Sequence, residues 1–138
     1  MTLTEEQIKE IAENFDIGMR CFYPLKNGEI KTTPDFLDGD WIDQDTEPWQ
    51  ETLDKLDENW GDYFEFEKMT SNESFEIMTD FAETVDNQNL QDRIFKALNK
   101  PKPFRNFKWE IDNSGEYRQK WFDYKNQRMI EFVKTQIE

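Results

Sequence analysis

The residues with the clearest potential for binding chemistry are cations that alternate with aromatic rings in the last third of the chain. They are Arg93, Lys102, Arg105, Lys108, Arg118, Lys125 and Arg128, interleaved with Phe104, Phe107, Trp121, Tyr124 and Phe132. A guanidinium can hold a phosphate or carboxylate through two hydrogen bonds, and an aromatic face can stack on a nucleobase. A helix opening at Pro103 would add amide donors near Arg105. The sequence therefore predicts a candidate site for a nucleotide, single-stranded RNA or an acidic peptide, formed by Arg105, Lys108, Trp121, Lys125 and Arg128.

A second interpretation gives these residues a structural role. In a chain with 31 acidic residues, arginines normally find carboxylate partners within the molecule, and aromatic rings normally lie in the core. The cations would then pair with the carboxylates of residues 35–67. We favour this interpretation over ligand binding and keep both open.

Residues 34–47 form an acidic stretch with carboxylates at positions 35, 38, 40, 43, 45 and 47. Calcium takes about six to eight oxygen ligands, so such a stretch suggests a calcium site. The spacing does not fit an EF-hand loop, because a loop starting at Asp38 would need glycine where Asp43 stands. We favour a solvated acidic loop and predict no metal site. As a further alternative, the acids from Asp35 to Glu67 could imitate phosphates, as an inhibitor or immunity-type decoy does.

Catalytic chemistry has little support in the residues. The chain contains no histidine, so it lacks the commonest general base and metal ligand. Its one cysteine, Cys21, lies in a predicted strand and is interpreted as a small packed residue. Its five glycines form no phosphate-binding loop. We predict no catalytic residue and no cofactor, and favour a non-enzymatic interaction or regulatory protein; the alternatives are a nucleotide- or RNA-binding protein and the acidic decoy.

Chain length and charge further restrict the class of protein. A chain of 138 residues is predicted to form a single domain, and its 21 aromatic residues favour a folded protein despite a mean hydropathy of −1.01. Residues 1–85 carry 23 acids and 6 bases, whereas residues 86–138 carry 8 acids and 11 bases. The net charge of −14 disfavours nucleic acid as a partner relative to a protein. The sequence has no apolar window long enough to span a membrane and no signal peptide, so we expect a cytoplasmic protein.

The first half of the chain, residues 1–69, is predicted to form an acidic helix and sheet part. A helix over residues 4–15 is indicated by a capping box of Thr4 and Gln7. Asn27-Gly28 between two extended runs predicts a hairpin with strands near 19–25 and 29–33, with Pro24 at a strand end or free edge. Thr46 is expected to cap a helix that runs to about Asn59 and is ended by Gly61, and alternation over residues 63–67 predicts a third strand.

The second half, residues 70–138, is predicted to be helical. Thr70 and Glu73 form a second capping box, and Asp86 is expected to cap the next helix, which stops before Pro101. A short helix begins at Pro103, with positions 104, 107, 108 and 111 on one face. The last helix covers about 116–137, with Phe122 on its core stripe and Trp121 on its flank. The fold class is therefore α+β: a three-stranded antiparallel sheet with an N-terminal helix, followed by a C-terminal four-helix bundle.

Several of these segments also carry a resemblance to a known family. They are Asn27-Gly28-Glu29-Ile30, the run over residues 63–67, Phe75-Glu-Ile-Met78, Leu90-Gln-Asp-Arg93, Pro103-Phe-Arg-Asn-Phe-Lys108 and Trp121-Phe122. Together they resemble the bacterial "uncharacterised protein family" numbered one-five-eight of the UPF series. The resemblance implies a small acidic α+β protein of unknown function and supplies no catalytic residue.

Overall fold

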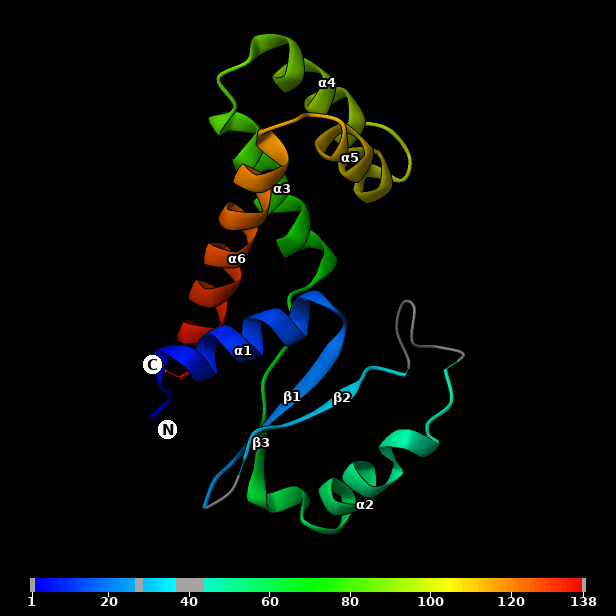
Figure 1. Cartoon of the computed structure of the whole chain (residues 1–138), viewed down its shortest axis with the longest axis vertical. Coiled ribbons are helices and arrows are strands. Elements are labelled where there is room, and N and C mark those ends of the chain that lie inside the picture. Colours follow the sequence, from blue (N-terminus) through cyan, green and yellow to red (C-terminus); the bar gives the residue numbers. More distant parts are fainter. Residues whose placement is uncertain (1, 27–28, 37–43, 138) are drawn as a thin grey trace. The chain divides into compact units, whose positions relative to one another are not determined.

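A computed structural model describes residues 2–26, 29–36 and 44–137 of the chain. Its tertiary contacts divide the chain into two compact units. The first, here called the sheet unit, comprises residues 1–68 and 130–138, and the second, the helical unit, comprises residues 69–129. The α+β class predicted from the sequence is confirmed: the described residues form a three-stranded antiparallel sheet, an N-terminal helix, a helix between the second and third strands, and four C-terminal helices (Figure 1).

The sheet unit begins with helix α1 (Glu5–Asp16), which packs on the central strand. The predicted capping box is present, because the Thr4 side chain accepts from the Gln7 amide and the Gln7 side chain accepts from the Thr4 amide. The apolar positions of α1 point inward, with Ile11 and Ala12 almost fully buried. The local pattern was therefore sufficient to predict this helix.

The sheet has the strand order β2-β1-β3, with β1 (Met19–Pro24) in the centre, β2 (Lys31–Pro34) on one side and β3 (Tyr63–Glu65) on the other. Both pairings are antiparallel, as predicted; Cys21 faces Thr32 and Phe22 faces Glu65. The turn at Asn27-Gly28, used to predict the hairpin, lies outside the described residues. Pro24 ends β1, where a missing amide donor has little effect.

The segment between β2 and β3 departs from the prediction at its start. Thr46 makes no capping hydrogen bond; its backbone is helical (φ −81°, ψ −15°) instead of extended, so its side chain cannot reach back to the amides. A 3₁₀ turn at Glu47–Trp49 comes first, followed by α2 (Gln50–Glu58). Gly61 lies within a second 3₁₀ turn, Trp60–Asp62, after the helix has already ended.

The helical unit begins with α3 (Ser71–Thr84), whose Thr70–Glu73 capping box is confirmed. Helix α4 (Gln88–Leu98) starts one residue later than predicted: its cap is Asn87, whose side chain accepts from the Leu90 amide. Asp86 is instead the acceptor for the hydroxyl of Tyr117. The carboxylate that looked like a cap therefore ties the turn between α3 and α4 to the last helix.

Helices α5 (Pro103–Asp112) and α6 (Tyr117–Thr135) complete the bundle, and α5 packs closely against α4 (Figure 1). Phe107 and Ile111 of α5 are buried, whereas Phe104, predicted to share their face, is 42% exposed. On α6 the buried ring is Trp121, and Phe122, predicted to lie on the core stripe, is only half-buried. The core of the unit is built from residues of all four helices: Ile77, Met78, Phe81, Ala82, Val85, Leu90, Ile94, Leu98, Phe107, Ile111 and Trp121.

Candidate functional site

Trp121, one of the five residues of the predicted site, is a core residue. It is 9% exposed, and its indole meets the rings of Phe81 and Phe107 edge-on at centroid distances of 5.3 and 4.8 Å. Edge-to-face contacts of this kind stabilise a pair beyond the burial of its area. The indole therefore holds α3, α5 and α6 together and has no free face for stacking on a ligand.

Lys125 and Arg128, also of the predicted site, lie near the same core. The Lys125 ammonium is 5.8 Å from the centre of the Trp121 ring and 5.1 Å from that of Phe122, within the range of cation–π attraction. Arg128 donates to Asp80 Oδ2 at 2.9 Å and to the Tyr124 hydroxyl at 2.8 Å. The hydrogen bond to Asp80 raises the pKa of Arg128. These two cations are engaged within the helical unit.

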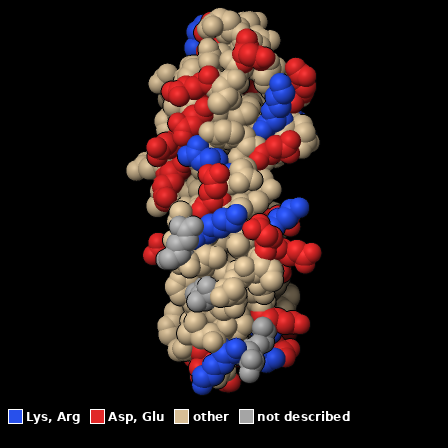
Figure 2. Space-filling model, turned by 90° about the vertical axis from the view of Figure 1, so that its left-hand side faces the viewer, with Lys and Arg blue, Asp and Glu red and all other residues tan. Residues whose placement is uncertain are grey.

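Other arginines of the bundle pair in the same way. Arg93 lies 3.3 Å from Glu110, and Arg118 lies 3.4 Å from Asp112. Each ion pair seen for these arginines among the described residues is with a carboxylate of the helical unit itself. These pairs join neighbouring helices of the unit, and the pairing with the carboxylates of residues 35–67 stays a prediction. On the face of the molecule shown in Figure 2, basic side chains lie among acidic ones.

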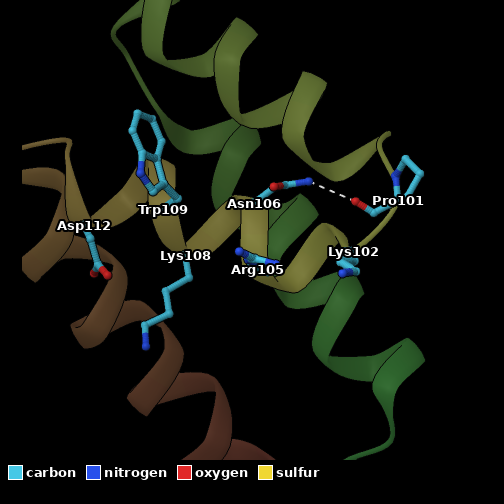
Figure 3. A pocket seen from close by; sticks show the side chains of 7 residues that line it. All are labelled: Pro101, Lys102, Arg105, Asn106, Lys108, Trp109 and Asp112. Atoms are coloured by element: carbon cyan, nitrogen blue, oxygen red, sulfur yellow. Dashed lines mark hydrogen bonds between the residues drawn. The ribbon is translucent and has the colours of Figure 1, made fainter.

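Arg105 and Lys108, the last two predicted residues, lie on α5 in a different setting. Both side chains are exposed, and neither forms an ion pair or side-chain hydrogen bond within the part of the chain that the structure describes. They line an open surface pocket of about 520 Å³ with other residues of α5 and the preceding loop (Figure 3). The lining consists of Pro101, Lys102, Arg105, Asn106, Lys108, Trp109 and Asp112.

The loop in front of this pocket is held in a specific conformation. Lys102 has left-handed backbone angles (φ 59°, ψ 55°), which cost a non-glycine residue about 1 kcal/mol or more. The Asn106 side chain donates to the Pro101 carbonyl at 2.9 Å, and the Asn106 amide donates to the Lys102 carbonyl at 3.1 Å. The prolines at 101 and 103 further restrict the chain. Lys102 is therefore presented at the start of α5 by a fixed backbone.

A second pocket of about 290 Å³ adjoins the first and shares Asn106 and Trp109 with it. It is lined by Arg93, Lys96, Ala97, Lys100, Asn106, Trp109 and Glu110. Trp109 thus borders both pockets, and it is 63% exposed. We call the surface formed by Lys96, Lys100, Lys102, Arg105, Lys108 and Trp109 the α4–α5 basic face.

Three members of this face, Lys96, Lys100 and Trp109, were missed by the sequence analysis. A usable signal was present: residues 93–109 contain six basic residues and no acidic one. Only Arg93 of these six cations has an ion-pair partner among the described residues. The structure therefore separates the five predicted site residues into Trp121, Lys125 and Arg128 by the core and Arg105 and Lys108 on the basic face.

The described residues do not form a site at the other positions that the sequence analysis considered, the acidic stretch and Cys21. Positions 37–43 of the acidic stretch, on which the calcium hypothesis depended, lie outside the described residues. Asp35 pairs with Lys68 at 3.1 Å. Among residues 2–26, 29–36 and 44–137, no three His, Cys, Asp or Glu side chains are grouped so that they could hold a metal ion. Cys21 is fully buried, and this burial raises the pKa of its thiol to about 12.

Comparison with known proteins identifies the family to which the chain belongs. Residues 25–137 match the uncharacterised protein family UPF0158, and because this match covers most of the chain, the chain belongs to that family. No curated protein and no solved structure gives a match. Within the described part of the chain, none of the helices combines the length and the apolar character needed to cross a membrane.

Proposed function

We propose that the chain is a non-enzymatic binding protein of the bacterial cytoplasm, and that its α4–α5 basic face holds an anionic ligand. The observation that carries this proposal is a group of five exposed cations around two adjoining pockets, none of which has an ion-pair partner among the residues that the structure describes. Elsewhere in the helical unit the arginines meet carboxylates of neighbouring helices. Cations that lack internal partners can neutralise the charges of a polyanion, and release of the counterions condensed on that polyanion then favours binding.

The charge distribution supports this location. The sheet unit has 21 acidic and 7 basic residues, whereas the helical unit has 10 of each. The entire net charge of −14 therefore belongs to the sheet unit, and the helical unit is neutral. Screening at physiological salt limits exposed charges to a range of about 8 Å, so an anion in contact with the basic face interacts mainly with the nearest cations.

Fixed geometry also favours binding over simple solvation. The strained backbone of Lys102 and the two hydrogen bonds of Asn106 hold the loop beside the larger pocket. Backbone strain persists only where surrounding structure enforces it, and it is concentrated at ligand clamps and active sites. A pre-organised site loses less entropy when a ligand binds.

The experiment compares binding of heparin, a polyanion, to two triple variants. Replacing Lys102, Arg105 and Lys108 by glutamine removes three cations of the basic face. The matched control replaces Lys9, Lys55 and Lys134 of the sheet unit by glutamine and changes the net charge equally. We expect the first variant to reduce the slope of log affinity against log salt by about two, and the control to leave it unchanged. Equal loss in both variants, or no heparin binding by the wild type, would overturn the proposal.

A further inference from the structure

We infer that the ligand of the α4–α5 basic face is a single-stranded nucleic acid, with the indole of Trp109 stacking on a base and the surrounding cations contacting phosphates. The inference rests on the proposed function and specifies its ligand. It depends on one arrangement, an exposed indole placed between two basic pockets.

Trp109 is unusual for its exposure. It is 63% exposed, and the pocket on one side contributes Lys102, Arg105 and Lys108 while the pocket on the other contributes Lys96 and Lys100. Figure 3 shows the Trp109 ring and the Lys108 side chain extending away from α5 in different directions. Among the described residues the Trp109 ring has no aromatic or cation–π contact, and with 63% of the residue exposed the indole offers aromatic surface to a ligand.

The chemistry of the face matches the alternation within a nucleic acid strand. Such a strand repeats a flat aromatic group and a charged group, and proteins bind it by combining stacking platforms with a basic groove. Each stacked base contributes roughly 1–3 kcal/mol, largely without regard to its identity. An acidic peptide would use the same cations but would give the exposed indole no comparable partner. The aromatic ring therefore distinguishes between the two classes of ligand.

The size and charge of the face also fit a single strand better than a duplex. The larger pocket, about 520 Å³, lies in the range of sites that hold a small ligand, roughly 300–1,000 Å³, and so can accept a single nucleotide. In a duplex the bases are stacked on each other and their faces are not accessible to Trp109. The carboxylates that share the pockets, Glu110 and Asp112, are paired with Arg93 and Arg118, which reduces their repulsion of phosphates.

The test measures fluorescence anisotropy of labelled oligouridine and oligothymidine, with heparin and a polyglutamate peptide as the other anions. Trp109→Ala is expected to weaken binding of both oligonucleotides by about 5- to 150-fold, the equivalent of losing one stacked base. Trp109→Phe, which keeps an aromatic face, should retain most of the affinity. Trp60→Ala is the matched control, because Trp60 is 57% exposed but belongs to the sheet unit, and it should have no effect.

Heparin separates failure of this inference from failure of the proposed function. We expect Trp109→Ala to leave heparin binding unchanged, because heparin has no base to stack. If heparin binds but the oligonucleotides are insensitive to Trp109→Ala, or if polyglutamate binds more tightly than oligouridine, the inference is overturned while the proposed function stands. If neither heparin nor oligonucleotides bind the wild type, both are overturned.

Discussion

Helices α5 and α6 each carry a tryptophan close to cations, but the two groups differ in burial and in ion pairing. On α6, Trp121 is 9% exposed and Arg128 is bonded to Asp80. On α5, Trp109 is 63% exposed and Arg105 has no ion-pair partner among the described residues. The same residue types thus build a core in one place and a charged surface in the other. Residue type and spacing alone do not distinguish the two outcomes.

The neighbouring helix accounts for the difference. Helix α6 meets α3, which supplies Phe81 as a ring partner and Asp80 as a carboxylate. Helix α5 buries Phe107 against the core, and Trp109, two residues further along, is rotated by about 200° to the opposite side of the helix. Whether a ring faces a neighbouring helix therefore decides whether it is packed or exposed.

The largest effect expected from this comparison concerns stability. Trp121→Ala should lower the free energy of unfolding by about 3–5 kcal/mol, because it removes a buried ring and leaves a cavity among α3, α5 and α6. Trp109→Ala should change it by less than about 0.5 kcal/mol, as for most exposed side chains. Urea unfolding followed by circular dichroism measures both. Similar losses in the two variants would contradict the assignment of the two rings.

A smaller effect is expected for the arginines. Arg128→Met keeps most of the aliphatic stem but removes the hydrogen bonds to Asp80 and Tyr124. Because the Arg128 side chain is about one-third exposed, we expect a loss of only about 1 kcal/mol. Arg105→Met, the matched change on α5, should stay within about 0.5 kcal/mol in the same unfolding assay. A larger loss for Arg105→Met would show that Arg105 has a structural partner.

The smallest effect is a pH dependence at the start of α6. The hydrogen bond to Asp86 raises the pKa of Tyr117 to about 12. A group whose pKa is raised by folding contributes stability that is fully present below its unfolded pKa, about 10 for tyrosine, and is lost as the pH rises through the folded value. The stability difference between wild type and Tyr117→Phe should therefore be constant from neutral pH to about pH 10 and vanish towards pH 12.

Absorbance titration of the phenols tests the same prediction directly. One of the four tyrosines should titrate near pH 12, and this transition should be missing in Tyr117→Phe. The same bond lowers the pKa of Asp86, so its contribution to stability is present above the usual carboxyl range and is lost in strong acid. Titration of Tyr117 at its ordinary value, near 10, would contradict the Asp86 contact.

The elements of this fold were predictable where the signal is local. The capping boxes at Thr4 and Thr70 involve residues three positions apart, and both were found from the sequence. The cap of α4 was predicted at Asp86 but is Asn87. Asp86 instead accepts a hydrogen bond from Tyr117, 31 residues away. Sequence spacing carries no information on such a distant partner.

The candidate site was predictable only in part for the same reason. Composition placed Arg105 and Lys108 in a basic cluster, and both line the pocket beside α5, but their association with Trp121 assumed that the exposed sides of α5 and α6 coincide. Trp121 instead faces Phe107 across the core. Trp109 was overlooked, since no local pattern marks a ring as exposed; the absence of acids over residues 93–109 was the one available indication.

The central claim is that an anion binds the α4–α5 basic face and does not bind at Trp121, Lys125 and Arg128. The most direct test is a ¹H–¹⁵N NMR titration of the labelled protein with oligouridine, with the five indole signals assigned by tryptophan-to-phenylalanine variants. The account predicts shifts of the Trp109 indole N–H and of backbone amides over residues 93–109, with the Trp121 indole unchanged. Shifts centred on Trp121 and Arg128, or no shifts at all, would contradict it.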